Sequence, residues 1–145
     1  MSLNTLWTRR TAMKSNGPPY IVQKAAAAVY TPEGQKQVRA LIDFYMENAR
    51  IIGAGLAAMG FTVYGGKNAP YIWVRTPRSV GSWDFFDQVL EKANVVGAPG
   101  AGFGPSGEGF LRCCFATSLE QIQTACERMG RFVGRQRSAG FQPAR

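Results

Sequence analysis

Histidine is absent from this 145-residue chain, and cysteine is scarce, with only three residues. Without imidazole the sequence cannot form a Ser-His-Asp or Cys-His catalytic group, nor the zinc sites that use histidine ligands. The cysteines, Cys113, Cys114 and Cys126, show no Cys-x-x-Cys spacing, and their odd number leaves one thiol over. A disulfide scaffold is therefore not expected, and this cysteine usage favours a reducing, cytoplasmic location.

Long apolar runs are also missing. No stretch of the sequence approaches the roughly 20 apolar residues that cross a bilayer, and the first residues lack the basic-then-apolar order of a signal peptide. We therefore expect neither a membrane partner nor export. The chain is nevertheless 46% hydrophobic and only 18% charged, a composition that can bury enough surface to form a core. Its length favours one domain.

Acidic residues are outnumbered, because 17 Lys plus Arg against 9 Asp plus Glu leave a net charge of +8. Most of this excess comes from the two ends of the chain: Arg9, Arg10 and Lys14 near the start, and Arg131, Arg135, Arg137 and Arg145 near the end. Because the excess is not gathered on one predicted helix, the electrostatic argument for nucleic acid is weak. A solvated basic surface is the simpler interpretation, and no nucleic-acid partner is expected.

The pattern of apolar residues predicts alternating helices and strands. We expect helices over residues 20–30, 31–60, 82–93 and 118–133, and strands over residues 61–64, 71–75, 94–96 and 110–115. Thr31 and Pro32 form a typical helix start, and Ser82 and Ser118 are expected to cap the two later helices. This order predicts an α/β (α+β) fold, a two-layer sandwich. Residues 134–145 lack periodicity, so we expect a disordered tail.

One glycine motif superficially indicates a nucleotide site. Gly102, Gly104 and Gly107 have the spacing of a dinucleotide fingerprint. That fingerprint needs a helix directly after the glycines, whose N-terminus receives the pyrophosphate. Here Pro105 interrupts the loop and a predicted strand follows, so no nucleotide binding is expected.

Arg112 is the candidate functional residue that the pattern itself indicates. It lies within an otherwise apolar predicted strand. Burying a guanidinium is costly without an anionic partner, and its planar fork matches a carboxylate through two hydrogen bonds. The residues leave two partners open: an internal carboxylate, from Glu108 or Glu127, or the carboxylate of a ligand.

Two stretches are specific in both order and spacing: "GKNAPYIW", and "NVVGAPGAGFGPSGEGFLR" ending at Arg112. Together with the segment from Thr31 to Gly60, they resemble the C-terminal part of the LL-diaminopimelate aminotransferases, which are pyridoxal-phosphate enzymes of the class I/II, fold-type I group. The resemblance covers residues 2–133. It implies an extended lead-in segment and a helix from the large-domain boundary over residues 1–30. It also implies the C-terminal small domain over residues 31–133, with helices packed on a small mixed sheet.

The same resemblance implies a function. Enzymes of this family are homodimers that transfer an amino group between LL-2,6-diaminopimelate and 2-oxoglutarate in lysine biosynthesis. Arg112 matches the family arginine that holds the substrate α-carboxylate. Asn16, in "KSNGPPYI", matches an asparagine that contacts cofactor and substrate.

The departures from the family pattern bear on activity. The lysine that binds pyridoxal 5'-phosphate covalently belongs to a Ser-rich segment that has no counterpart in this sequence, and the family's cofactor pocket belongs to the large domain. We therefore expect that this chain alone binds no pyridoxal phosphate and is inactive, as a gene fragment or as half of a split enzyme. The alternative is a non-catalytic module for protein interaction or dimerisation. A basic nucleic-acid-binding domain is the less favoured alternative.

Overall fold

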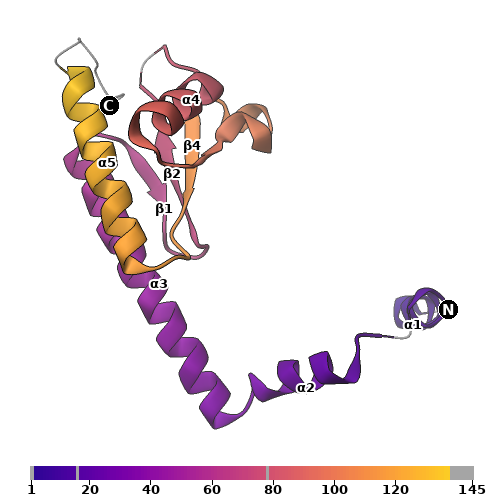
Figure 1. The fold of residues 1–145 in the computed structure, drawn as a ribbon. Coiled ribbons are helices and arrows are strands. Elements are labelled where there is room, and N and C mark those ends of the chain that lie inside the picture. Colours follow the sequence, from indigo (N-terminus) through magenta and orange to yellow (C-terminus); the bar gives the residue numbers. More distant parts are fainter. Residues whose placement is uncertain (1, 16, 78, 138–145) are drawn as a thin grey trace. The chain divides into compact units, whose positions relative to one another are not determined.

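The computed structural model describes residues 2–15, 17–77 and 79–137 (Figure 1). Its contacts divide the chain into two units, Met1–Ile42 and Asp43–Arg145. This boundary falls inside a helix, later in the chain than the expected boundary after residue 30. Within the described residues, no helix is both long enough and apolar enough to span a membrane.

The first unit consists of helices. They are α1 (Leu3–Lys14), α2 (Tyr20–Ala28) and the first part of α3 (Pro32–Ala58). The expectation of an extended segment before α2 was wrong, because α1 is helical and Ser2 caps it by accepting a hydrogen bond from the backbone N–H of Thr5. The start of α3 is as predicted, since the Thr31 hydroxyl accepts from the backbone N–H of Gly34.

The second unit contains a four-stranded sheet. Its strands are β1 (Val63–Gly65), β2 (Tyr71–Arg75), β3 (Ala98–Pro99) and β4 (Phe110–Cys114), in the order β1-β2-β4-β3. All three pairings are antiparallel, so the expected mixed sheet was wrong. Helix α4 (Ser82–Ala93) carries the chain from β2 to β3, which run in the same direction. Strand β4 lies between them and pairs with both in the opposite direction.

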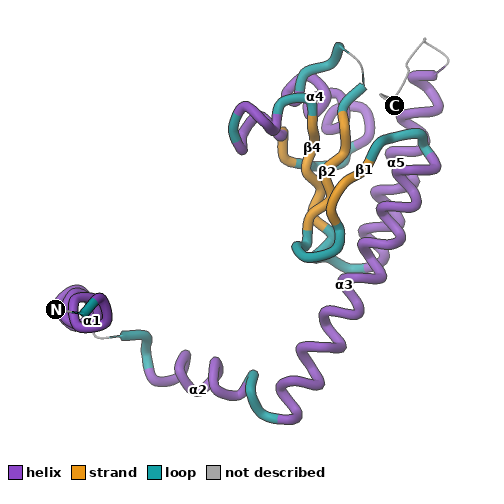
Figure 2. Tube along the Cα trace, turned by 180° about the vertical axis from the view of Figure 1, so that it is seen from behind, coloured by secondary structure: helices purple, strands orange, loops and turns teal. Residues whose placement is uncertain are grey.

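The helices of the second unit pack on one face of this sheet, which confirms the α/β fold class. The second part of α3 and helix α5 (Leu119–Arg137) run side by side next to the sheet (Figures 1 and 2). One core cluster joins β2 and β4 to the three helices. Its most buried members include Val74, Phe85, Val89, Leu111 and Phe115.

Three local expectations need correction. Residues 94–96 form no strand, because Asn94 takes a left-handed conformation (φ 52°) that ends α4 and redirects the chain. Ser82 does not cap α4, because the cap position is Gly81. Helix α5 begins after Ser118, as expected, but continues past residue 133 to Arg137. The predicted disordered tail therefore does not start at residue 134, and residues 138–145 lie outside the described residues.

Candidate functional site

The candidate site lies on the face of the sheet that points away from the core. Successive side chains of a strand alternate between faces, so Ile72 and Leu111 enter the core while Trp73 and Arg112 point the other way. The register places Trp73 opposite Arg112 on the neighbouring strand. Tyr64 of β1 is opposite Trp73 and belongs to the same face. Aromatic rings and the guanidinium of Arg112 therefore lie together on this face.

Two aromatic rings contact the guanidinium of Arg112. Its Cζ atom lies 4.1 Å from the ring centroid of Tyr71 and 4.0 Å from that of Phe103. Tyr71 is a diagonal neighbour on β2, whereas Phe103 ends the short helix η1 (Gly100–Phe103) in the loop between β3 and β4. Both contacts are favourable, because the negative face of each ring attracts the cation. Rings from two separate elements thus restrict one half-buried guanidinium.

Neither expected internal carboxylate pairs with Arg112. The Glu108 carboxylate accepts a hydrogen bond of 2.9 Å from the backbone N–H of Ser82. Glu127 is exposed on α5, and among the described residues the salt bridge within 4.0 Å joins Glu47 to Arg50. The interpretation of Arg112 as part of an internal ion pair is therefore not supported. Its N–H groups face no carboxylate of the described chain.

The loop that carries Phe103 is closed at its base by two glycines. A Cβ atom added to Gly100 would lie 2.1 Å from the carbonyl oxygen of Gly107, and one added to Gly107 would lie 2.0 Å from that of Gly100. Only glycine permits such close backbone approach. Of the glycines with dinucleotide spacing, Gly107 thus has a packing role, and a strand rather than a helix follows the loop.

Ser82 fixes the same loop to the start of α4. Its side chain is fully buried, and the hydroxyl accepts hydrogen bonds from the backbone N–H groups of Gly109 (2.9 Å) and Phe110 (3.2 Å). It donates to the carbonyl oxygen of Gly107 at 3.3 Å. The chain that enters β4, two residues before Arg112, is therefore held by a side chain from another element.

Asn48 holds the chain where it leaves β4. This residue of α3 is 1% exposed, and its amide nitrogen donates to the carbonyl oxygens of Phe115 (3.1 Å) and Thr117 (2.8 Å). Its side-chain oxygen is buried without a partner. Sequence reasoning missed this role, although a signal was present: Asn48 interrupts an apolar stripe formed by Tyr45, Ala49 and Ile52.

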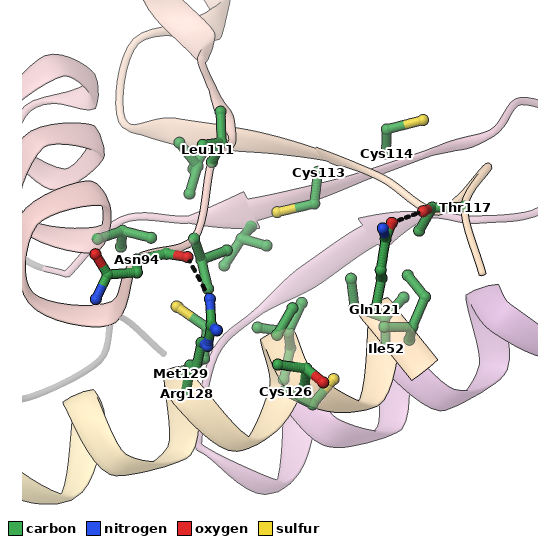
Figure 3. A pocket seen from close by; sticks show the side chains of 18 of the residues that line it. Ile52, Asn94, Leu111, Cys113, Cys114, Thr117, Gln121, Cys126, Arg128 and Met129 are labelled. Carbon is green, nitrogen blue, oxygen red and sulfur yellow. Dashed lines mark hydrogen bonds between the residues drawn. The ribbon is translucent and has the colours of Figure 1, made fainter. Parts of the chain in front are cut away.

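A hollow of about 640 Å³ lies on the core side of β4, next to α5 (Figure 3). Arg128 donates a hydrogen bond of 3.0 Å to the carbonyl oxygen of Asn94 beside it. Three thiols line it, those of Cys113, Cys114 and Cys126. Burial raises the pKa of Cys113 to about 12 and also raises that of Cys126. Thiols with raised pKa values are poor nucleophiles at neutral pH, so Cys113 and Cys126 are not candidate nucleophiles.

The described residues do not by themselves form a site for a covalently bound cofactor or a metal. All five lysines are exposed: Lys14, Lys24, Lys36, Lys67 and Lys92. None of these contacts the rings around Arg112. In the part of the chain that the structure describes, no group of three or more His, Cys, Asp or Glu could hold a metal ion. Asn16, the predicted cofactor and substrate contact, lies outside the described residues.

Comparisons with known proteins agree on one group. A family model for class I and II aminotransferases matches residues 6–129. The chain is 55% identical over 127 residues to LL-diaminopimelate aminotransferase of Lawsonia intracellularis (strain PHE/MN1-00), a match that covers 88% of this chain and 31% of the relative.

Solved structures give the same result. The chain is similar to L,L-diaminopimelate aminotransferase from Chlamydomonas reinhardtii, with a TM-score of 0.83, 45% identity, and coverage of 86% of this chain and 30% of that one. An aromatic aminotransferase from Pyrococcus horikoshii OT3 matches with a TM-score of 0.73 and 31% identity, over 78% of this chain and 31% of that one. The chain thus spans about a third of the length of these relatives.

Proposed function

Because the chain belongs to the class I and II aminotransferase family, we propose that it supplies the part of an LL-diaminopimelate aminotransferase that binds the substrate carboxylate. The complete enzyme transfers an amino group between LL-2,6-diaminopimelate and 2-oxoglutarate, a reaction of lysine biosynthesis. The identity of 55% to a relative of that name supports this substrate. The observation that carries the proposal is Arg112, a half-buried guanidinium that rings restrict and that no described carboxylate neutralises.

In the proposed function, Arg112 binds the substrate and orients it. Its planar fork donates two parallel hydrogen bonds to the α-carboxylate of the amino acid or of the 2-oxo acid. Because arginine stays protonated at all physiological pH values, it moves no proton and provides a fixed positive charge. Orientation of a bound substrate lowers the barrier by removing rotational freedom before the reaction.

The cofactor of this family is pyridoxal 5'-phosphate, and the described residues do not fit it on their own. Every lysine is exposed, and none contacts the rings around Arg112. The covalent lysine and the phosphate pocket must therefore come from sequence outside this chain. Asn16 is the residue we assign to contact both the cofactor and the substrate. This chain alone is inactive under the proposal.

The first unit offers a surface for the remainder of the enzyme. Large apolar side chains are exposed on it, among them Leu3 (85%), Trp7 (69%), Ile21 (77%) and Tyr30 (83%). Large apolar side chains exposed in such number are typical of a surface that a partner covers. Under the proposal it is covered by the large domain and by the second subunit of a homodimer. The three free thiols favour a reducing compartment, so we assign the assembly to the cytoplasm.

Complementation tests this function. The purified chain is mixed with a fragment of the Lawsonia enzyme that lacks the matched region, together with pyridoxal phosphate, LL-diaminopimelate and 2-oxoglutarate. Glutamate formation is expected only in the mixture. Arg112→Ala in the mixture should raise the KM for LL-diaminopimelate at least tenfold. Arg75→Ala is the matched control, because Arg75 is exposed on the same strand face and stacks on Phe110 instead.

Two results contradict the proposal. An inactive mixture, under conditions where the intact relative turns over, refutes the assignment of this chain to the aminotransferase reaction. An active mixture in which Arg112→Ala leaves the KM unchanged refutes the role of Arg112.

A further inference from the structure

We propose that Tyr71 and Phe103 make Arg112 selective for planar carboxylates over tetrahedral anions. This inference rests on the proposed function of Arg112 as an anion-binding residue. It concerns the two rings, which act through the guanidinium and are therefore positioning residues. The ligand class is a monocarboxylate group, presented by an amino acid or a 2-oxo acid.

The contact geometry restricts how an anion approaches. Both ring centroids lie within 4.1 Å of Cζ. A ring that received an N–H group head-on would lie farther from Cζ, so this distance favours rings stacked against the faces of the guanidinium rather than across its N–H edge. The guanidinium donates its hydrogen bonds within its own plane. The approach that stays open is therefore along that plane, at the edge that carries the N–H groups.

The shape of the anion then decides how well it fits. A carboxylate is flat, and both of its oxygens lie in the plane of the guanidinium when the two form parallel hydrogen bonds. A sulfonate or phosphonate has a third oxygen that projects out of this plane, toward the volume next to the rings. Placing a charged oxygen against the negative face of an aromatic ring is unfavourable. The rings therefore weaken the binding of a tetrahedral anion to Arg112 and leave the binding of a flat carboxylate unaffected.

Further rings hold Phe103 in place. Its ring contacts Trp73 with a centroid distance of 5.5 Å, and Trp73 contacts Phe110 at 6.2 Å. Tyr71 needs no such support because it lies within β2, whose register against β4 is fixed by the sheet. Both rings are therefore set by the fold of this chain itself, and the selectivity is measurable without the rest of the enzyme.

The test uses NMR of the full chain labelled with nitrogen-15. The Nε–H resonance of Arg112, assigned by its loss in Arg112→Lys, reports the rings through their ring-current shift. Titrations with acetate and with methanesulfonate, two probes of equal charge, then give two dissociation constants. We expect acetate to bind at least fivefold more tightly, and this ratio to fall at least threefold in Phe103→Leu and in Tyr71→Leu.

Acetate and methanesulfonate differ in basicity, and this difference contributes equally to the ratio of dissociation constants in every variant. A change in the ratio between variants therefore reports the effect of the substitution alone. Tyr71→Phe keeps the ring and should keep the wild-type ratio. Tyr64→Leu is the matched control, since Tyr64 belongs to the same sheet face but contacts Phe110 rather than Arg112, and it should also leave the ratio unchanged.

The outcomes separate this proposal from the proposed function. An unchanged ratio in Phe103→Leu and Tyr71→Leu, or an Nε–H resonance that none of the ring substitutions shifts, overturns the selectivity role whatever the complementation assay shows. A ratio that falls as expected supports it even where the mixture proves inactive, and only the assignment to an aminotransferase then fails.

Discussion

Replacement of Ser82 by alanine should destabilise the second unit strongly. The fully buried hydroxyl makes three hydrogen bonds to the backbone of residues 107–110. A hydrogen bond contributes about 1 kcal/mol net, and a buried donor left without a partner costs about 1–3 kcal/mol. Loss of two accepted bonds and one donated bond is therefore expected to lower the free energy of unfolding by about 3 kcal/mol. Urea unfolding followed by tryptophan fluorescence measures this change.

A second substitution at Ser82 distinguishes the two roles considered for it. A serine that caps a helix is replaced by aspartate at little cost. A buried serine that binds a loop is not, because aspartate adds an uncompensated charge and has no proton for the Gly107 carbonyl oxygen. Ser82→Asp should therefore be less stable than Ser82→Ala. Ser106→Ala, at an exposed serine of the same loop, should change stability by less than about 0.5 kcal/mol. A Ser82→Asp variant as stable as the wild type refutes this reasoning.

Three further changes probe the frame around Arg112, each measured by urea unfolding. Asn48→Asp keeps the shape of the side chain but replaces the amide that donates to two carbonyl oxygens with an acceptor. This change should lower the free energy of unfolding by about 3 kcal/mol. An unchanged unfolding midpoint would contradict the role of Asn48. Gly100→Ala forces a Cβ atom against backbone and should cost more than about 2 kcal/mol, whereas Gly102→Ala, with nothing within 4 Å, should cost less than about 1 kcal/mol. The raised pKa of Cys113, about 12 against an ordinary 9.0, favours the protonated thiol in the folded state. Its stabilisation is therefore complete below pH 9 and is lost as the pH rises toward about 12. The fall in unfolding free energy from pH 8 to pH 11 should accordingly be smaller in Cys113→Ala, and equal falls would rule out this cause.

Local signals predicted most elements of the second unit. The strands at residues 71–75 and 110–115 and the helix at residues 82–93 appear within a residue of their expected bounds, because apolar periodicity and breakers mark them. The antiparallel sheet could not be predicted in the same way. A strand, a helix and a strand in sequence favour parallel neighbours, and the insertion of β4 between β2 and β3 is decided by tertiary packing. Helix α1 was missed because residues 3–14 have no apolar stripe and bury no side chain.

Of the residues in the candidate site, the sequence predicted only the charged one, Arg112. Arg112 was identifiable because a guanidinium in an apolar strand is unusual. Tyr71 and Phe103 were not, since their contacts require the register of β2 against β4 and the fold of a loop with two short helical turns. Ser82 was assigned the wrong partners, because sequence shows which residues precede a helix but not which loop folds back onto it.

The central position of β4 constrains the order in which the domain assembles on the ribosome. Among the described residues, strand β3 pairs with β4 alone, and β2 has no partner but β1 until β4 is synthesised. A nascent chain that has emerged as far as residue 109 therefore holds a single hairpin, with α4 lacking most of the sheet on which it packs. Such hairpins are marginally stable in water. We therefore expect the domain to fold only after β4 and α5 have left the exit tunnel, and its exposed apolar surface favours aggregation until then.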